Sequence, residues 1–209
     1  MADHIGKATP AHVPETSVCP LLRCVRAPCP GADDLAIERR TLGLSPLQLA
    51  AALPSLGKLL YLSVNQRASP SGVLPPGLLT DTVELMPLLQ FRKLRAASLI
   101  TVEGPCEWIE CADRYGHASA RMYLLPDSDF LAWDGLHAAV GSNAPVARAS
   151  PTAQPCLDRA RIVQFRHRTW AGMQLLSAES CVRISTLSCR VATQIVRSDV
   201  VSGWLRQRP

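Results

Sequence analysis

Aromatic and cationic side chains near the middle of the chain are of the types that bind a planar anionic ligand. Trp108 and Tyr123 offer flat apolar surfaces, and the guanidinium of Arg121 can pair with carboxylates or stack on an indole. His117 lies nearby in the sequence, and we include its imidazole among the candidate ligand-binding groups. We therefore expect a ligand surface in which Arg121 binds the anion and the two aromatic rings form its floor.

A β-hairpin is predicted to place these side chains together. Residues 106–112 and 117–125 alternate apolar and polar types, and residues 113–116 between them, DRYG, suit a tight turn. If Ala112 pairs with His117, Trp108 lies opposite Arg121. The other face of the hairpin then forms the core, with Ile109, Cys111, Ala118, Ala120, Met122 and Leu124. An ordinary solvated sheet face carrying one stacked arginine is the alternative interpretation.

Two further arginines, Arg166 and Arg168, are predicted side by side on a later strand. Residues 159–176 alternate so that Val163, Phe165 and His167 point one way and the arginines point the other. Like charges two residues apart on one face need solvent or an anion, so we include both arginines among the candidate ligand-binding residues. His137 is instead expected to be a helix-end residue of a short helix that begins after Asp127 or Ser128 and packs Phe130 and Trp133 on the sheet.

Two cysteines near the N-terminus, Cys19 and Cys29, are the candidate metal ligands. Cys19 and Cys29 each precede a proline, and these dipeptides resemble the short Cys-Pro haem-regulatory motifs. The resemblance implies that a thiolate ligates ferric haem and that proline turns the chain away. The alternative is that the dipeptides occur incidentally among 17 prolines. A structural zinc site is disfavoured because the second cysteine pair, Cys106 and Cys111, is predicted on a strand.

Composition narrows the class of protein. The 209 residues carry a formal charge of +5, from 19 Arg and 3 Lys against 17 acidic residues, which is too modest to indicate a nucleic-acid partner. No apolar run is long enough to span a membrane, and the first residues lack the apolar segment of a secretory signal. We therefore expect a cytoplasmic protein with reduced thiols and no membrane partner.

The sequence contains none of the common motifs that indicate a particular enzymatic reaction. The sequence has no phosphate-binding glycine loop, no nucleophile elbow and no zinc-protease motif. Cys111 and His117 are predicted on opposite faces of the hairpin, so the only obvious thiol and base do not meet. The segment from Leu44 to Leu53 superficially resembles the start of a helix-turn-helix, but no basic recognition helix follows. A thiol-dependent enzyme is thus the least favoured class.

The remaining sequence predicts an α+β fold with a small antiparallel sheet and helices packed on one face. N-terminal helices are expected over 33–42, 47–53 and 85–94, and an amphipathic helix over 181–201. Residues 1–31 are expected to be irregular or disordered, and residues 32–209 to form a single domain with loops at 66–77 and 141–156.

We predict from these patterns a non-enzymatic binding protein for an anionic planar ligand, with haem as the specific expectation. The alternative is a regulatory adaptor without a small-molecule ligand, in which the arginine row of the last helix, Arg183, Arg190 and Arg197, and the exposed sheet face meet a protein partner. If Arg121 is a surface residue, its truncation to alanine should cost about 1 kcal/mol or less. Oligomeric state does not follow from the sequence.

Overall fold

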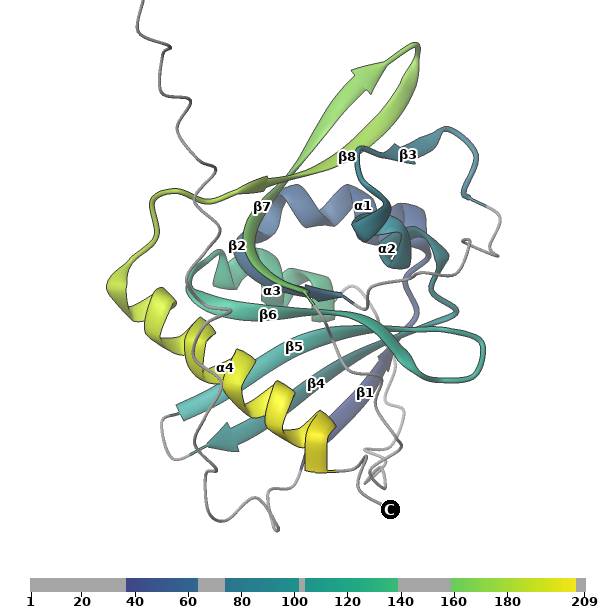
Figure 1. Ribbon diagram of the computed structural model, residues 1–209. Coiled ribbons are helices and arrows are strands. Elements are labelled where there is room, and N and C mark those ends of the chain that lie inside the picture. Colours follow the sequence, from purple (N-terminus) through teal and green to yellow (C-terminus); the bar gives the residue numbers. More distant parts are fainter. Residues whose placement is uncertain (1–36, 64–73, 102–103, 139–158, 206–209) are drawn as a thin grey trace, which may run out of the picture.

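The computed structural model describes residues 37–63, 74–101, 104–138 and 159–205 (Figure 1). Its strands form one eight-stranded sheet in the order β1-β4-β5-β6-β2-β7-β8-β3. The strands are β1 (Glu38–Leu42), β2 (Gly57–Ser63), β3 (Leu78–Thr80), β4 (Lys93–Thr101), β5 (Gly104–Ala112), β6 (Ala118–Ser128), β7 (Arg159–Trp170) and β8 (Met173–Ser180). All neighbouring strands are antiparallel except β3 and β8, which are parallel.

Helices cover both faces of this sheet. The α-helices are α1 (Pro46–Ala52), α2 (Met86–Gln90), α3 (Phe130–Ala138) and α4 (Thr186–Leu205), with short 3-10 turns η2 (Leu53–Leu56) and η3 (Val83–Leu85). Helices α1, α2 and α3 pack on one face, and α4 crosses the other (Figure 1). The α+β class is therefore confirmed, whereas the predicted small sheet with every helix on one face is wrong.

Strand β2 shows why helices are needed on both sides. Leu59 and Tyr61 lie in the core under α1–α3, and Leu60 and Leu62 lie in the core under α4. All four are at most 3% exposed, so this strand is apolar on both of its faces. An uninterrupted apolar run is typical of a strand that is covered from both sides.

The predicted hairpin is present, with its pairing shifted by two residues. Trp108 lies opposite Tyr123, and Glu110 lies opposite Arg121. The connection is longer than predicted because Asp113 to His117 all lie outside the ladder, and Ser119 forms a bulge whose hydroxyl donates to the carbonyl of Cys111. A shift of two residues leaves each side chain on its predicted face. The core face is accordingly confirmed for Ile109, Cys111, Ala120 and Met122.

Several element assignments from the sequence are confirmed and others are wrong. Ser45 caps α1 through a capping box with Gln48, as the Ser-Pro start predicted. The helix expected over 33–42 is the edge strand β1 where it is described, and the helix expected over 85–94 stops at Gln90 and gives way to β4. The strand expected over 159–176 is a hairpin that turns at Gly172. Predictions for residues 1–31 and 141–156, and for most of 66–77, fall outside the described residues.

Candidate functional site

The predicted ligand face is buried. Trp108 and Tyr123 are each 4% exposed and stack on one another with ring centroids 5.4 Å apart. Both rings belong to the core that contains Ala192, Ile195 and Val196 of α4. The expectation of an exposed face was therefore wrong, because the last helix packs over the aromatic side of the hairpin and not beside the other helices.

Arg121 lies in the same buried layer and is held by an ion pair. Its Nε lies 3.1 Å from Glu110 Oε2, and the other carboxylate oxygen of Glu110 accepts from Arg95 Nη1 at 3.1 Å. Arg121 and Glu110 are each 3% exposed. The guanidinium thus serves the packing of the sheet, since a buried carboxylate needs such partners. The cation–π contact with Trp108 that the sequence predicted is replaced by the Trp108–Tyr123 stack.

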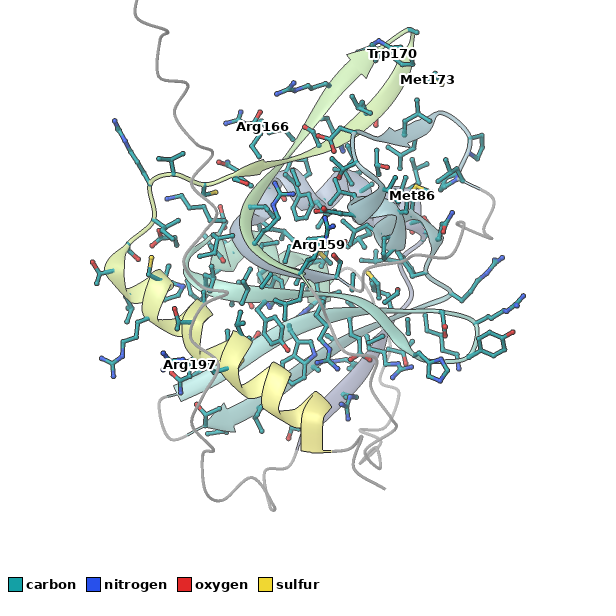
Figure 2. The ribbon with its side chains drawn as sticks, in the orientation of Figure 1. Met86, Arg159, Arg166, Trp170, Met173 and Arg197 are labelled. Carbon is teal, nitrogen blue, oxygen red and sulfur yellow. The ribbon has the colours of Figure 1, made fainter. Side chains whose placement is uncertain are left out.

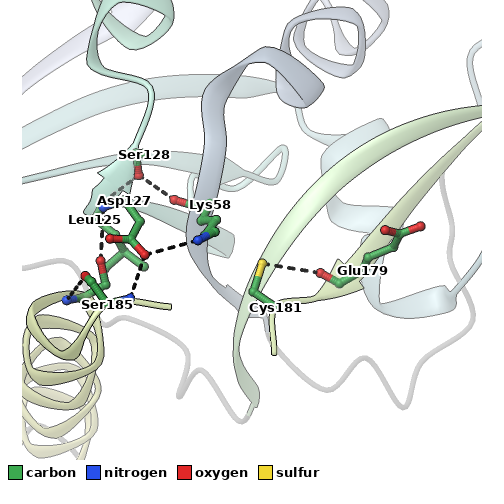
Figure 3. Close-up of polar contacts among 8 residues, drawn as sticks. Lys58, Leu125, Asp127, Ser128, Glu179, Cys181 and Ser185 are labelled. Atoms are coloured by element: carbon green, nitrogen blue, oxygen red, sulfur yellow. Dashed lines mark hydrogen bonds and ion pairs between the residues drawn. The ribbon is translucent and has the colours of Figure 1, made fainter. Parts of the chain in front are cut away.

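Hydrogen bonds and an ion pair of Asp127 hold the start of α4 against the sheet (Figure 3). Asp127 Oδ2 accepts from the backbone N–H of Ser185 at 2.8 Å and pairs with Lys58 Nζ at 3.3 Å. The backbone N–H of Asp127 in turn donates to the hydroxyl of Ser188, which is fully buried. The hydrogen bonds from Ser185 hold the pKa of the Asp127 carboxyl well below its usual range. The predicted ligand face is therefore closed by a helix that is anchored by specific bonds.

The remaining predicted site residues lie apart from one another. His117 is exposed at the β5–β6 turn, where its Nδ1 is 3.5 Å from Asp113 Oδ2. Arg166 and Arg168 are exposed on β7, and both pair with Glu179 at 2.7 Å. Cys19 and Cys29 lie outside the described residues. The structure therefore does not bring the six predicted ligand-binding residues together into one site.

A different group of side chains forms the best candidate site, under α3 on the opposite face of the sheet. We call it the α3 site, and it consists of Arg40 of β1, Glu107 of β5, and Trp133 and His137 of α3. Asp129 starts this helix by accepting from the backbone N–H of Ala132 at 2.9 Å. The indole N–H of Trp133 donates to Glu107 Oε2 at 2.9 Å, which fixes the helix over β5.

His137 is the chemically distinctive member of the α3 site. Its ring centroid lies 5.3 Å from that of Trp133, and its Nε2 is buried without a hydrogen-bond partner among the described residues. Burial, together with the positive charge of Arg40, lowers the pKa of the imidazole below 6.5. The ring is therefore neutral at neutral pH, which is the form that binds a metal ion.

The other described histidines have partners. His117 pairs with Asp113, and the Nε2–H of His167 donates to the carbonyl of Ala50 at 2.9 Å. The sequence placed His137 correctly on the side of the helix that carries Trp133, but it gave the residue only a helix-end role. The i, i+4 spacing of Trp133 and His137 was the available signal. The position of Arg40 follows from the pairing of β1 with β4, which joins residues far apart in the sequence.

The lowered pKa of His137 has a consequence for stability between pH 7 and pH 5. The unfolded chain binds a proton at this imidazole near pH 6.5, and the folded chain does so only at lower pH. The free energy of unfolding should therefore fall as pH drops below about 6.5, because the unfolded chain then binds more protons than the folded chain. Urea denaturation at pH 7, 6 and 5 should show this fall, and His137→Gln should reduce it.

The lowered pKa values of two carboxyl groups affect stability in a separate, more acidic pH range. They therefore do not interfere with the comparison of the wild type and His137→Gln between pH 7 and 5. The pKa values of Asp127 and Glu179 are lowered from 3.8 and 4.5, so the stability that they contribute is lost only as pH falls below those values. Identical pH slopes for the wild type and His137→Gln between pH 7 and 5 would contradict the assignment of the effect to His137.

Comparison with known proteins leaves the family open. No protein-family model matches the chain, and no curated protein matches it. Among solved structures, the haem-binding protein PhuS of Pseudomonas aeruginosa aligns in its holo form over 56% of this chain and 38% of its own, at 21% identity and a TM-score of 0.38. The haem-degrading enzyme ChuS of Escherichia coli O157:H7 aligns over 54% of this chain and 40% of its own, at 20% identity and a TM-score of 0.38.

These alignments are too weak to support an argument. The chain spans about two fifths of the length of either protein, and TM-scores below 0.5 do not establish a shared fold. The function of this chain is therefore argued from its own residues. Among the residues that the structure describes, no helix is long and apolar enough to cross a membrane.

Proposed function

We propose that this chain is a non-enzymatic binding protein for haem or a similar planar anionic ligand, acting in the cytoplasm. The observation that carries the proposal is the neutral imidazole of His137, whose buried Nε2 has no partner among the described residues. Haem iron needs few ligands from the protein, because the porphyrin supplies four, and histidine is a common axial ligand. A single available imidazole is therefore enough to hold it.

The neighbours of His137 suit the other parts of such a ligand. Arg40 is exposed on the edge strand β1, and its charge lies close enough to lower the pKa of His137. Its guanidinium can therefore pair with a haem propionate at the surface of the protein. Trp133 is 1% exposed and packs beside the imidazole, so it positions the His137 ring and does not itself face the ligand. The Nε2 atom of His137 is buried, so a ligand that binds it must displace the atoms that cover it. We therefore expect the end of α3 to move when the ligand binds.

Cys111, the thiol of the predicted thiol–base pair, is unsuited to nucleophilic chemistry. Cys111 is fully buried, and burial raises the pKa of its thiol far above the usual value. His117, the base closest to it in the sequence, is exposed at the turn and paired with Asp113. A protonated thiol away from any base is a poor nucleophile, so Cys111 serves as a small apolar residue of the core.

A haem titration of the full chain tests the proposal. Ferric haem should give a Soret shift that saturates at one haem per chain, and His137→Ala should weaken binding by at least about tenfold, since it removes the iron ligand. The matched control is His117→Ala, which removes an exposed imidazole and should leave the affinity unchanged. The absence of a Soret shift at stoichiometric protein would overturn the proposal.

The N-terminal cysteines are tested in the same titration. Cys19 and Cys29 remain proposed haem ligands because of their Cys-Pro context. A Cys19→Ala, Cys29→Ala double variant separates a thiolate from an imidazole, since the two ligands give different Soret positions. If the double variant loses haem and His137→Ala keeps it, the iron is bound by the N-terminal segment and the α3 site is not the haem site.

The alternative function, a regulatory adaptor, retains one supporting observation. Arg190 and Arg197 are exposed on α4, and Arg183 is exposed just before it. The exposed sheet face that was expected to complete this surface lies under α4, so the adaptor proposal rests on the arginine row alone. It expects a specific protein partner whose binding is lost in an Arg190→Glu, Arg197→Glu variant, together with no response to haem.

A further inference from the structure

The β7–β8 hairpin extends beyond the rest of the sheet and ends in an exposed tryptophan (Figures 1 and 2). Strand β2 pairs with β7 only as far as Gln164, whereas β7 and β8 remain paired to Trp170 and Met173. We call residues 165–178 the arm. Its tip is remote from the α3 site, so binding at the tip does not depend on haem (Figure 1).

The tip of the arm is apolar. Trp170 is 62% exposed and lies directly across from Met173, and both are drawn at the end of the hairpin in Figure 2. Trp108 and Trp133, by contrast, are at most 4% exposed. The connection between the strands is only two residues, and Ala171 takes a φ of 49°, a left-handed conformation that costs a non-glycine residue energy.

The arm is stiff, because a third strand pairs with it. Residues 78–80 of β3 run parallel to residues 174–176 of β8. The backbone N–H of Gln174 donates to Gly77 at 2.9 Å, and that of Asp81 donates to Leu176 at 3.1 Å. The exposed indole is therefore presented on an ordered support, so little conformational entropy is lost when it binds a surface.

Cationic side chains follow behind the tip on the same face. Arg168 and Arg166 lie two and four residues from Trp170, so the alternation of the strand places all three on one face. Both guanidinium groups contact Glu179 at 2.7 Å, yet their side chains remain 61% and 54% exposed. A guanidinium has five N–H donors, so each keeps donors that can reach a phosphate while the ion pair holds its position.

We propose that the arm docks this protein on an anionic phospholipid bilayer, with Trp170 and Met173 entering the interface. A strand rises about 3.4 Å per residue, which places Arg168 roughly 7 Å behind Trp170 and Arg166 roughly 14 Å behind it. The polar layer of a bilayer leaflet is on the order of 5–8 Å thick. With the indole at the lower boundary of that layer, Arg168 lies at the depth of the lipid phosphates. Tryptophan favours this boundary, and arginine is attracted by anionic headgroups.

The shape of the tip favours a bilayer over a second copy of the chain. Stable protein interfaces bury about 800 Å² on each partner, over some 20 residues. The arm offers two apolar side chains at a convex end, which is far less surface. A bilayer deforms around an inserted side chain and needs no complementary pocket.

Co-sedimentation of the full chain with vesicles tests the proposal. Vesicles of phosphatidylcholine with about 30% phosphatidylserine should bind the protein, and pure phosphatidylcholine vesicles should not. Trp170→Ala and Arg168→Glu should each weaken binding by roughly tenfold, and raised salt should weaken it further.

The chain supplies a matched control for each variant. Tyr115 is 69% exposed on the β5–β6 turn, and Arg114 lies over its ring at 4.7 Å. Tyr115→Ala removes an exposed aromatic ring, and Arg114→Glu changes the net charge exactly as Arg168→Glu does. Both control variants should bind the vesicles like the wild type.

Four results would overturn the proposal. Equal binding to the anionic and neutral vesicles, or no binding to either, would exclude anionic lipid as the partner. Equal loss of binding in Arg114→Glu and Arg168→Glu would show that overall charge and not the arm holds the protein. Concentration-dependent dimers that disappear in Trp170→Ala would show, by analytical ultracentrifugation, that the tip binds a second copy.

Discussion

Replacing Trp133 by alanine is expected to lower the free energy of unfolding by about 4 kcal/mol. Trp133 is 1% exposed and fills the space between α3 and the sheet, so truncation leaves a large cavity. It also removes the donor that satisfies Glu107, whose carboxylate accepts from the indole N–H at 2.9 Å. Urea denaturation measures the loss.

Two variants separate the cavity from the hydrogen bond. Trp133→Phe keeps most of the volume and removes the donor, so its cost should be well below that of Trp133→Ala. Trp170→Ala truncates the same residue type at the exposed tip of the arm and should change stability by about 0.5 kcal/mol or less. Similar losses at positions 133 and 170 would contradict the placement of α3 on the sheet.

Replacing Arg121 by alanine is expected to cost about 3 kcal/mol. The substitution leaves Arg95 as the ion-pair partner of the buried Glu110 carboxylate among the described residues, and breaking a buried pair typically costs about 3–5 kcal/mol. Arg95 keeps the loss toward the lower end of that range. This value replaces the figure of about 1 kcal/mol or less that followed from a surface position.

The mechanism of that loss can be checked with a second substitution. Adding Glu110→Gln to Arg121→Met removes the uncompensated charge, so the double variant should recover part of the stability lost in Arg121→Ala. Arg114→Ala, at an exposed turn position, should stay within about 0.5 kcal/mol of the wild type. If denaturation of Arg121→Ala shows a loss no larger than that of Arg114→Ala, Arg121 is not buried.

Local patterns predicted the hairpin, its faces and the last helix. The alternation around Ile109 and Met122 identified the core face correctly, because each strand side chain must take one of two sides. The same alternation could not show whether the opposite face meets water. Trp108 and Tyr123 are compatible with an exposed ligand surface and with a second core, and the packing of α4 decides between them.

The errors of the sequence interpretation arise from tertiary pairing. Residues 38–42, ERRTL, have a polar composition that suits a helix, but they form the edge strand β1 because β4 supplies a pairing partner. The α3 site was missed for a related reason. Arg40, Glu107 and His137 are far apart in the sequence, and only the order of the strands brings them to one end of the sheet.

The central place of β2 bears on how the chain folds as it is synthesised. This early strand lies between β6 and β7, and its pairing of Lys58 with Gln164 spans 106 residues (164 − 58). One edge of β2 is covered once β6 has emerged from the ribosome at Ser128, but β7 completes the opposite pairing only at Gln164. Translation at 5–20 residues per second leaves that edge open for about 2–7 s over the intervening 36 residues (164 − 128). A long apolar edge strand invites association with other chains. The nascent protein therefore passes through a stage in which five of the eight strands can be paired and the apolar strand β2 lacks its second neighbour.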